Sequence, residues 1–329
     1  MGISFSTVSK ALNNSPVVKE ETRQLVLQKA KELDYAPNML ARGLRSKSSK
    51  TIAAIFNDIE NPVLTYIYRK ISIDMAKYGY TTLICDAQFD PDIERSNILS
   101  VVARMPDFVI IEPTTSDPAN LKLLANMANR VIVLGKRYPG INHNFIQIDY
   151  ELGGYLAAKE LLAKGHRDCL VIAEPIAFPI SGQFIHGIHR AYQDHGLELE
   201  PERIIYTHAS IENGSKAIMQ LWDYNEKRFK INFTGVMTFN DAVAYGVYKA
   251  ASHLALRIPQ DISVIGFDDN PLSAFSLPPL TTIYLPREKI AGSIIEILHN
   301  VLLHNDQEIY NFFLEPYLVS RDSVNDLNN

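Results

Sequence analysis

Short continuous apolar runs alternate with longer helical patterns along most of the chain. Between residues 51 and 268, runs such as TIAAIF, DFVIIE, RVIVLG, DCLVIA and ISVIGF are separated by stretches with apolar residues three and four positions apart. Continuous apolar runs are typical of strands that are buried on both faces, and intervening helices connect such strands in parallel. The pattern starts a second time after residue 149. It therefore predicts an α/β fold with two doubly wound parallel-sheet subdomains.

The first 50 residues follow a different pattern. Residues 4–13 have apolar positions at helical spacing and end in Asn-Asn-Ser-Pro, which stops a helix, and a second helix is predicted over residues 19–33. Residues 39–44 could form a further short helix, which Gly43 weakens, and a Ser/Lys-rich stretch of linker type follows it. We expect a small helical unit joined to the α/β part through this segment.

Charge is distributed unevenly between these parts. The net charge of the 329 residues is −5, but residues 1–50 contain nine Lys and Arg against four acidic residues, so the remainder carries −10. A basic head on an acidic body is typical of a nucleic-acid-binding unit attached to a separate regulatory domain. The two cysteines, Cys85 and Cys169, lie in apolar runs and are expected to be reduced. With no membrane span and no leader pattern, the expected location is the cytoplasm.

Polar residues that directly follow strands are the candidates for binding a small molecule. In parallel sheets, ligands bind beyond the carboxyl ends of the strands, and two sheets that face each other can form a cleft there. The alternative interpretation of each such residue is a helix cap or a turn. The candidates from this pattern are Asn57, Asp58, Lys136, Arg137, Asn240, Asp241, Asp268 and Asp269.

The sequence resembles the lactose-repressor/galactose-repressor (LacI/GalR) family of bacterial transcription regulators over essentially its whole length. The resemblance rests on ordered blocks that include GISFSTVSKALNN, IDYELGGYLAAKELLAKGHR, FNDAVAYGVYKAA and IPQDISVIGFDDNPLSAFSLPPLTTIYLPR. It implies a helix-turn-helix headpiece, a hinge helix and a two-lobed core that resembles periplasmic sugar-binding proteins. It also implies a homodimer that binds operator DNA with an affinity set by a small effector.

The resemblance also implies the domain boundaries, because the chain of such a core crosses between its lobes more than once. The expected parts are a partial headpiece (1–34), a hinge and linker (35–50), an N-terminal subdomain (51–148 plus 284–312), a C-terminal subdomain (149–283 plus 313–322) and a tail (323–329). No sustained leucine heptads occur in the tail, so we expect no coiled-coil tetramer.

For the headpiece, the resemblance assigns residues 4–13 as the recognition helix. Phe5 and Ser6 would reach base edges in the major groove, and Lys10 would lie near bases or phosphate. Leu44 matches the family's apolar wedge in the minor groove. The remaining expected DNA-binding residues are Ser4, Thr7, Ser9 and Asn13.

The sequence departs from the family pattern in two places. A helix that should precede the turn at Gly2 is missing, which we interpret as a truncated start, with a headless relative as the alternative; we expect this 329-residue form to bind operator DNA weakly. In the cleft, the family's SxxRxxG pattern becomes Ser181-Gly182-Gln183-Phe184-Ile185-His186-Gly187. Phe184 thus replaces an arginine, and we expect Ser181 and Phe184 to contact an effector that is a sugar, a sugar phosphate or a nucleoside-like molecule.

Other functional classes find less support in the sequence. An enzyme would need a nucleophile with its base, metal ligands or a phosphate-binding loop, and no such pattern is present, so we expect no catalytic residue, no cofactor and no metal. A solute-binding protein of a transporter would share the two-lobed core but would lack the basic head. A ligand sensor without DNA binding stays open as an alternative, because the first helix of the headpiece is missing.

Overall fold

The computed structural model describes residues 2–12, 15–34 and 48–328, and the chain divides into two compact units, Met1–Ser49 and Lys50–Asn329. The first unit contains α1 (Phe5–Leu12) and α2 (Glu20–Glu32). The hydroxyl oxygen of Ser4 accepts a hydrogen bond from the backbone N–H of Thr7 at 3.2 Å, so Ser4 caps the start of α1. Buried Ala11, Val18 and Val26 form the small apolar centre between the helices.

In the second unit, each sheet is built around the alternation that the sequence predicts. The first sheet has the strand order β13-β5-β4-β3-β1-β2, and each neighbouring pair in it is parallel. Its strands are β1 (Thr51–Phe56), β2 (Thr81–Asp86), β3 (Phe108–Ile111), β4 (Val131–Gly135), β5 (Asn144–Ile148) and β13 (Asn311–Leu314). The helices of this half are α4 (Pro62–Ala76), α5 (Pro91–Ala103) and α10 (Arg287–Leu298), with the π-helical turn η3 (His299–Leu303) after α10.

The second sheet has the order β14-β12-β11-β10-β6-β7, with only the β12–β14 pair antiparallel among the described strands. Its strands are β6 (Cys169–Ala173), β7 (Ile204–Tyr206), β10 (Gly235–Thr238), β11 (Ser263–Asp268), β12 (Thr281–Tyr284) and β14 (Tyr317–Val319). Its helices are α6 (Tyr150–Ala163), α7 (Ser181–Asp194), α8 (Ile211–Met219) and α9 (Asp241–His253), with the turn η2 (Pro201–Arg203) and a hairpin of β8 (Trp222–Asp223) and β9 (Arg228–Phe229).

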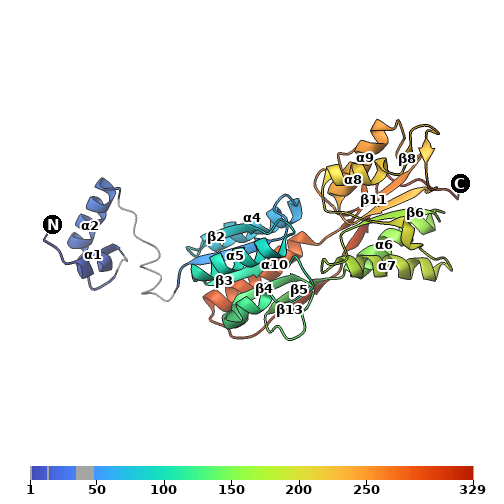
Figure 1. Ribbon diagram of the computed structural model, residues 1–329. Coiled ribbons are helices and arrows are strands. Elements are labelled where there is room, and N and C mark those ends of the chain that lie inside the picture. Colours follow the sequence, from blue (N-terminus) through green and yellow to red (C-terminus); the bar gives the residue numbers. More distant parts are fainter. Residues whose placement is uncertain (1, 13–14, 35–47, 329) are drawn as a thin grey trace. The chain divides into compact units, whose positions relative to one another are not determined.

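Helices cover both faces of the second sheet. Successive residues of a strand point to opposite sides, so the cluster to which each residue belongs shows which helices cover that side. Val171 of β6 belongs to the apolar cluster that includes α6 and α7, whereas Leu170 and Ile172 belong to the cluster with α8 and α9. Figure 1 shows the pair α6 and α7 apart from the pair α8 and α9. The chain therefore has the predicted fold class, two doubly wound α/β subdomains.

Three sequence-based details differ from the structure. The chain leaves the second sheet after Tyr284 and the first sheet after Leu314, so the expected boundaries at residues 283 and 312 fall inside β12 and β13. Residues 121–130 form 3₁₀ turns (η1, Leu121–Arg130) in place of a regular helix, because Ala128 has a φ of 49° and breaks the helical path. Sequence periodicity alone could not show this interruption.

Gly154 of α6 and Gly187 of α7 let the two helices approach closely. A Cβ atom built on Gly154 would overlap the carbonyl oxygen of Phe184, and one on Gly187 would overlap the carbonyl oxygen of Glu151. These obstacles are backbone atoms, which cannot rotate away. The glycines at 153 and 154 thus have a packing role. Their sequence does not match a phosphate-binding loop.

We expect Gly187→Ala to lower the free energy of unfolding by about 2 kcal/mol, because an added methyl group must push the two helices apart. Gly292→Ala in α10 is the matched control. No atom lies within 4 Å of a Cβ built there, so this substitution should stabilise the protein by up to about 1 kcal/mol through helix propensity. Thermal unfolding of both variants measures the difference; equal melting temperatures would contradict the role assigned to Gly187.

Candidate functional site

The exposed face of α1 carries the residues expected to read DNA. Ser6 and Lys10 are exposed and four positions apart, so they lie on the same side of the helix, and Thr7 and Ser9 are half-buried. Ser4 is exposed but also caps the helix. Phe5 lies in the first turn of α1, while its side chain, Asn13 and Leu44 lie outside the described residues. The described part thus presents a hydroxyl and an ammonium group together.

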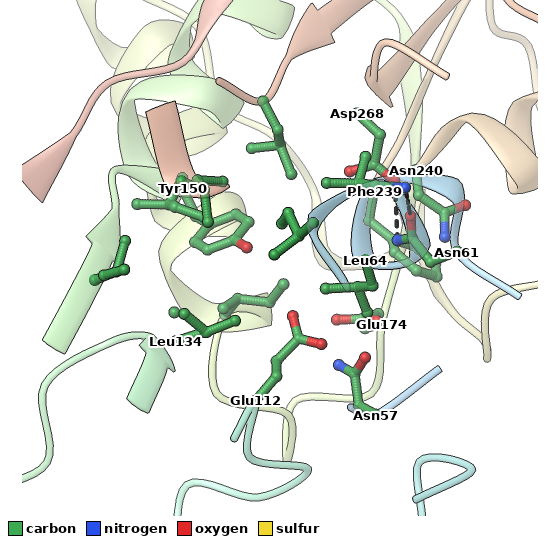
Figure 2. A pocket seen from close by; sticks show the side chains of 18 of the residues that line it. Asn57, Asn61, Leu64, Glu112, Leu134, Tyr150, Glu174, Phe239, Asn240 and Asp268 are labelled. Atoms are coloured by element: carbon green, nitrogen blue, oxygen red, sulfur yellow. Dashed lines mark hydrogen bonds between the residues drawn. The ribbon is translucent and has the colours of Figure 1, made fainter. Parts of the chain in front are cut away.

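A pocket lies within the second unit, where the carboxyl ends of both sheets' strands meet. It encloses about 670 Å³ of unfilled space, part of which is open to solvent. From the first sheet it is lined by Asn57 after β1, Glu112 after β3 and Gly135 at the end of β4. From the second it is lined by Glu174 after β6 and by Asp268 at the end of β11 (Figure 2). This is the location that the strand-end rule predicts.

The walls of the pocket are mainly apolar. Side chains from α4, the ends of β4 and β5, and the start of α10 supply this surface, together with the aromatic rings of Tyr150 and Phe239. The apolar residues are Val63, Leu64, Ile67, Phe89, Leu134, Ile146, Ile148, Ile180, Leu285 and Ile290. Such a lining with a few polar groups is the usual composition of a small-molecule site.

Three carboxyl groups line this apolar space. Glu174 is 6% exposed and Asp268 is 8% exposed, while Glu112 keeps some contact with solvent through the pocket. Burial raises the pKa of the Glu112 carboxyl to about 8, against the opposing effect of the Asn57 backbone amide. Burial, together with the charge of Glu112, also raises the pKa of Glu174 to about 8. Burial is likewise the main cause that raises the pKa of Asp268 well above its usual range.

The raised pKa of Glu174 makes the stability of the folded protein depend on pH. A carboxyl with an ordinary pKa of 4.5 and a folded pKa of about 8 holds its proton in the folded state while the unfolded chain has lost it. Stability should therefore fall as pH rises from 4.5 to 8, by up to about 1.4 kcal/mol per pH unit for such a group, and level off above pH 8.

We accordingly expect Glu174→Gln to be more stable than the unmodified protein, with a gain that grows between pH 6 and pH 8. Thermal unfolding at several pH values measures this, at roughly 2–4 °C per kcal/mol. Exposed Glu202→Gln is the control and should show no such trend. A gain that shrinks with rising pH would contradict the assigned protonation state.

Asn61 and Asp268 join the two halves of the core across the pocket. The Asn61 side-chain amide, at the start of α4, donates a hydrogen bond of 3.3 Å to Oδ2 of Asp268, at the end of β11 (Figure 2). Asp268 and Asp269 have φ values of 109° and 53°, a region that side-chain-bearing residues rarely adopt. Such strain is common at ligand sites and costs about 1–3 kcal/mol, which the surrounding contacts must offset.

An aromatic contact also links the two halves next to the pocket. The ring of Phe89, which follows β2, lies 5.3 Å from that of Phe178, which follows β6, in an edge-to-face arrangement. His208, after β7, lies 5.8 Å from Phe178. The backbone N–H of Ser116 donates to the carbonyl of Ala177 at 3.4 Å in the same region. Of these residues, Phe89 lines the pocket, so the contacts fix one part of its wall.

Of the effector residues expected from strand ends, the structure brings Asn57, Asn240 and Asp268 into the pocket. Asn240 also caps α9 by accepting a hydrogen bond from the backbone N–H of Val243 at 2.9 Å, so the alternative capping role applies as well. Asp58 does not line the pocket. Its carboxylate accepts from the backbone N–H of Glu60 at 2.8 Å and forms a turn beside it.

The other expected effector residues lie elsewhere. Phe184 is 3% exposed and packs edge-to-face on Phe267 at 5.7 Å in the core, so it has no ring face for stacking on a ligand. The Ser181 hydroxyl is buried and donates to the carbonyl oxygen of Glu174 at 2.6 Å. Both side chains therefore contact other parts of the protein, Glu174 and Phe267. The expectation that they contact the effector is therefore corrected by the packing of α7.

The two basic candidates also stay outside the pocket. The Lys136 ammonium group donates to the Ser116 hydroxyl at 3.0 Å and lies 5.1 Å from the centre of the Tyr138 ring. Arg137 is exposed, with its guanidinium carbon 5.9 Å from the centre of the Phe145 ring. The predicted positive charge for an anionic ligand is thus absent from the described pocket wall.

Several residues that line the pocket were not expected from the sequence. Glu112 and Glu174 directly follow the strands of DFVIIEP and DCLVIAE, so the strand-end rule applied to every strand would have found them. Asn61 and Tyr150 stand at helix starts, where a cap or a core residue was the more ordinary interpretation. Phe239 is part of a strand end whose neighbour, Asn240, had been selected.

Comparisons with known proteins agree with this architecture. A family model described as a periplasmic binding protein-like domain matches residues 158–324, and one described as bacterial regulatory proteins, lacI family, matches residues 1–38. The chain belongs to the lacI family of bacterial regulatory proteins. The match at residues 1–38 favours a regulator over a transporter's solute-binding protein.

Individual members of the family match along almost the whole chain. The HTH-type transcriptional repressor PurR of Pasteurella multocida is 28% identical over 324 residues, which are 98% of this chain and 96% of the relative. PurR of Aliivibrio fischeri is 29% identical over 323 residues, 98% of this chain and 95% of the relative. These relatives are transcriptional regulators and not enzymes.

Solved structures of lacI-family proteins have the same fold. The lac repressor dimer bound to operator and the anti-inducer ONPF superimposes with a TM-score of 0.79 at 25% identity, covering 98% of this chain and 96% of that chain. A lacI-family regulator from Silicibacter pomeroyi gives a TM-score of 0.83 at 21% identity with the same coverage.

None of the helices in the described part of the chain is long and apolar enough to cross a membrane. Within residues 2–12, 15–34 and 48–328, no group of three or more His, Cys, Asp or Glu side chains is arranged to hold a metal ion.

Proposed function

We propose that this protein is a cytoplasmic transcriptional repressor whose affinity for operator DNA is set by a small molecule in the pocket between its two subdomains. The observation that carries the proposal is the pocket at the facing strand ends of a lacI-family core, in a chain whose first 38 residues match the lacI-family regulator model. The boundaries of the functional parts follow the sequence analysis, shifted to the chain crossings after Tyr284 and Leu314.

In this proposal the headpiece contacts DNA through α1. Phe5 and Ser6 read base edges in the major groove, and Lys10 contacts bases or phosphate. Leu44 inserts into the minor groove, where unstacking costs a few kcal/mol that the wrapped DNA offsets. The hydroxyl and amide groups of Ser4, Thr7, Ser9 and Asn13 bind the backbone.

Asn57, Asn61, Asn240 and Asp268 are the polar groups that we propose to orient the effector. They come from both sheets, so a ligand bound among them stabilises one relative position of the subdomains. Similar proteins have been solved with cellobiose and with ribose, which supports a carbohydrate or carbohydrate derivative as the starting hypothesis for the effector.

Removing the gene from its native cells tests the repressor function. A repressor predicts that a small set of transcripts rises in the deletion strain and returns to normal when the unmodified gene is restored. Restoring a Lys10→Glu version should leave those transcripts high. A deletion that raises no transcript would contradict the proposal.

We also propose that the protein acts as a homodimer through an apolar patch formed by Leu272, Phe275 and Leu277, which are 63%, 81% and 90% exposed. A second copy is the proposed occupant because the similar lac repressor was solved as a dimer. Exposed apolar groups of this size are typical of protein interfaces.

We expect Leu277→Asp to shift the protein from dimer to monomer, since a buried, unpaired carboxylate is costly at an apolar interface. Sedimentation velocity at micromolar concentration measures the state. Tyr224→Asp, in the β8–β9 hairpin, is the control and should remain dimeric. A monomeric unmodified protein, or an unchanged Leu277→Asp dimer, would contradict the assignment of this patch.

A further inference from the structure

The ionisable side chains that line the pocket are acidic or phenolic. Glu112, Glu174, Asp268 and Tyr150 face the space, and no Lys, Arg or His among the described residues lines it. Figure 2 shows the Glu112 and Glu174 carboxyl groups close together at one end of the pocket and Asp268 at another. A positive guest can therefore pair with carboxylates that form when these acids ionise, whereas phosphate or carboxylate would meet no positive group among the lining residues.

The Glu174 carboxyl and one oxygen of the Glu112 carboxyl lack hydrogen-bond partners among the described residues. Within the described chain, no group donates a hydrogen bond to the Glu174 carboxyl, although this residue is 94% buried. Oε2 of Glu112 is fully buried and likewise has no hydrogen-bond partner among the described residues. Buried polar groups are almost always paired, so carboxyl oxygens without partners on two residues at the wall of one cavity indicate that a ligand completes them.

Three basic side chains that do not line the pocket have partners elsewhere. Lys136 bonds to Ser116. Arg321 forms an ion pair of 2.6 Å with Asp269, and Arg287 donates to the carbonyl oxygen of Asp269 at 2.8 Å.

We propose that the effector is a small organic cation, bound with its protonated nitrogen against Glu112 and Glu174 and its carbon skeleton against the apolar walls. The proposal rests on the proposed function, because it assigns the chemical class of the effector in that same pocket. An amine or amidine on a compact ring meets both requirements, and an amino sugar is the carbohydrate that fits this charge. Asn57 and Asn240 remain available for neutral groups of the ligand.

Protonation explains how the empty pocket tolerates its acidic lining. The titratable groups around Glu112 and Glu174 are Asp58, Asp268, the Tyr150 phenol and each other, and Asp268 also interacts with Asp241. All of these are acids, so the empty pocket holds protons that neutralise its carboxyls. An arriving cation replaces one of them: one of the two glutamic acids releases its proton to solvent and pairs as a carboxylate with the nitrogen, so the net charge of the site is preserved.

Two matched series of compounds test the charge preference by calorimetry on the full chain. The first consists of benzylamine, benzyl alcohol and benzoate, and the second of glucosamine, glucose and glucose 6-phosphate. The proposal predicts binding in the order cation, neutral, anion within a series, with at least a tenfold difference between the first two. A neutral or anionic member that binds as tightly as the cation, or no cation bound at millimolar concentration, would overturn it.

The release of protons provides an independent readout. Below about pH 8 the Glu174 carboxyl of the empty pocket holds its proton, and ligand binding must release it. Benzylamine affinity should therefore rise up to tenfold per pH unit between pH 6 and pH 8 if one proton is released. The binding heat should change with the ionisation enthalpy of the buffer. Binding without proton release would contradict the proposed exchange.

Single substitutions test whether Glu174 binds the charged nitrogen of the ligand. Glu174→Gln should weaken benzylamine at least tenfold and leave benzyl alcohol unchanged, whereas Glu202→Gln on the surface should change neither. These binding measurements do not involve DNA, so they separate the two proposals. Amine binding by a protein that occupies no operator would contradict only the proposed repressor function. Operator control without amine binding would contradict only the proposal that the effector is a cation.

Discussion

Replacement of Asp241 by alanine is expected to lower the free energy of unfolding by about 3–5 kcal/mol. Asp241 begins α9 and is 1% exposed. Its Oδ2 accepts hydrogen bonds from the Ser273 hydroxyl at 2.5 Å and the Asn270 backbone N–H at 2.7 Å, and its Oδ1 accepts from the Thr282 hydroxyl at 2.6 Å.

The size of this loss follows from the donors left behind. Each buried donor without an acceptor costs about 1–3 kcal/mol, and a cavity too small to be well hydrated offers little compensation. The same bonds hold the segment that directly follows Asp268 at the end of β11, and Asp241 directly follows Asn240, so they fix two residues that line the pocket. We therefore expect ligand binding to weaken together with stability.

Thermal unfolding measures the effect, which corresponds to a drop of roughly 10 °C. Asp241→Asn is the matched variant. It keeps the shape and one good acceptor, so its melting temperature should lie between those of the unmodified protein and Asp241→Ala. Two variants with the same small change would show that the hydrogen bonds of Asp241 contribute little.

Lys10→Glu is expected to reduce affinity for operator DNA about 100-fold, the second large effect. It removes a positive contact from the exposed face of α1 and places a carboxylate against phosphate or base acceptors, and one such contact is worth about 1–3 kcal/mol before the added repulsion. Ser6→Ala on the same face should cost less, since it removes only one hydroxyl.

Fluorescence anisotropy with DNA from a bound chromosomal site measures these ratios against the unmodified chain. Lys31→Glu, near the end of α2, is the control for the change in net charge. If Lys10→Glu and Lys31→Glu reduce affinity equally, α1 does not read the DNA and the effect is one of overall charge.

The sequence was sufficient for the fold class and the position of the pocket, because buried parallel strands leave a plain signature of apolar runs. The strand-end rule selected Asn57, Asn240 and Asp268, which line the pocket, since the backbone direction of a parallel strand determines where the residue after it lies. The same rule could have selected Glu112 and Glu174, whose acidic chemistry in an apolar pocket changes the expected ligand.

Side-chain direction and close packing could not be predicted from the sequence. Phe184 occupies a position that the family pattern places in the cleft, yet its ring turns to Phe267 in the core. Lys136 follows β4 as expected, but its flexible side chain reaches Ser116. The contact of Gly187 with the backbone at Glu151 depends on how α6 and α7 meet, which local periodicity does not encode.

The most direct test of DNA regulation is to map the chromosomal sites occupied by the natively encoded protein, tagged at its C-terminus and crosslinked in its own cells. The account predicts a small number of discrete sites that share a two-fold symmetric sequence and disappear when Lys10 is replaced by glutamate. Occupancy no higher than in an untagged strain would contradict DNA binding and leave ligand sensing as the function of this chain.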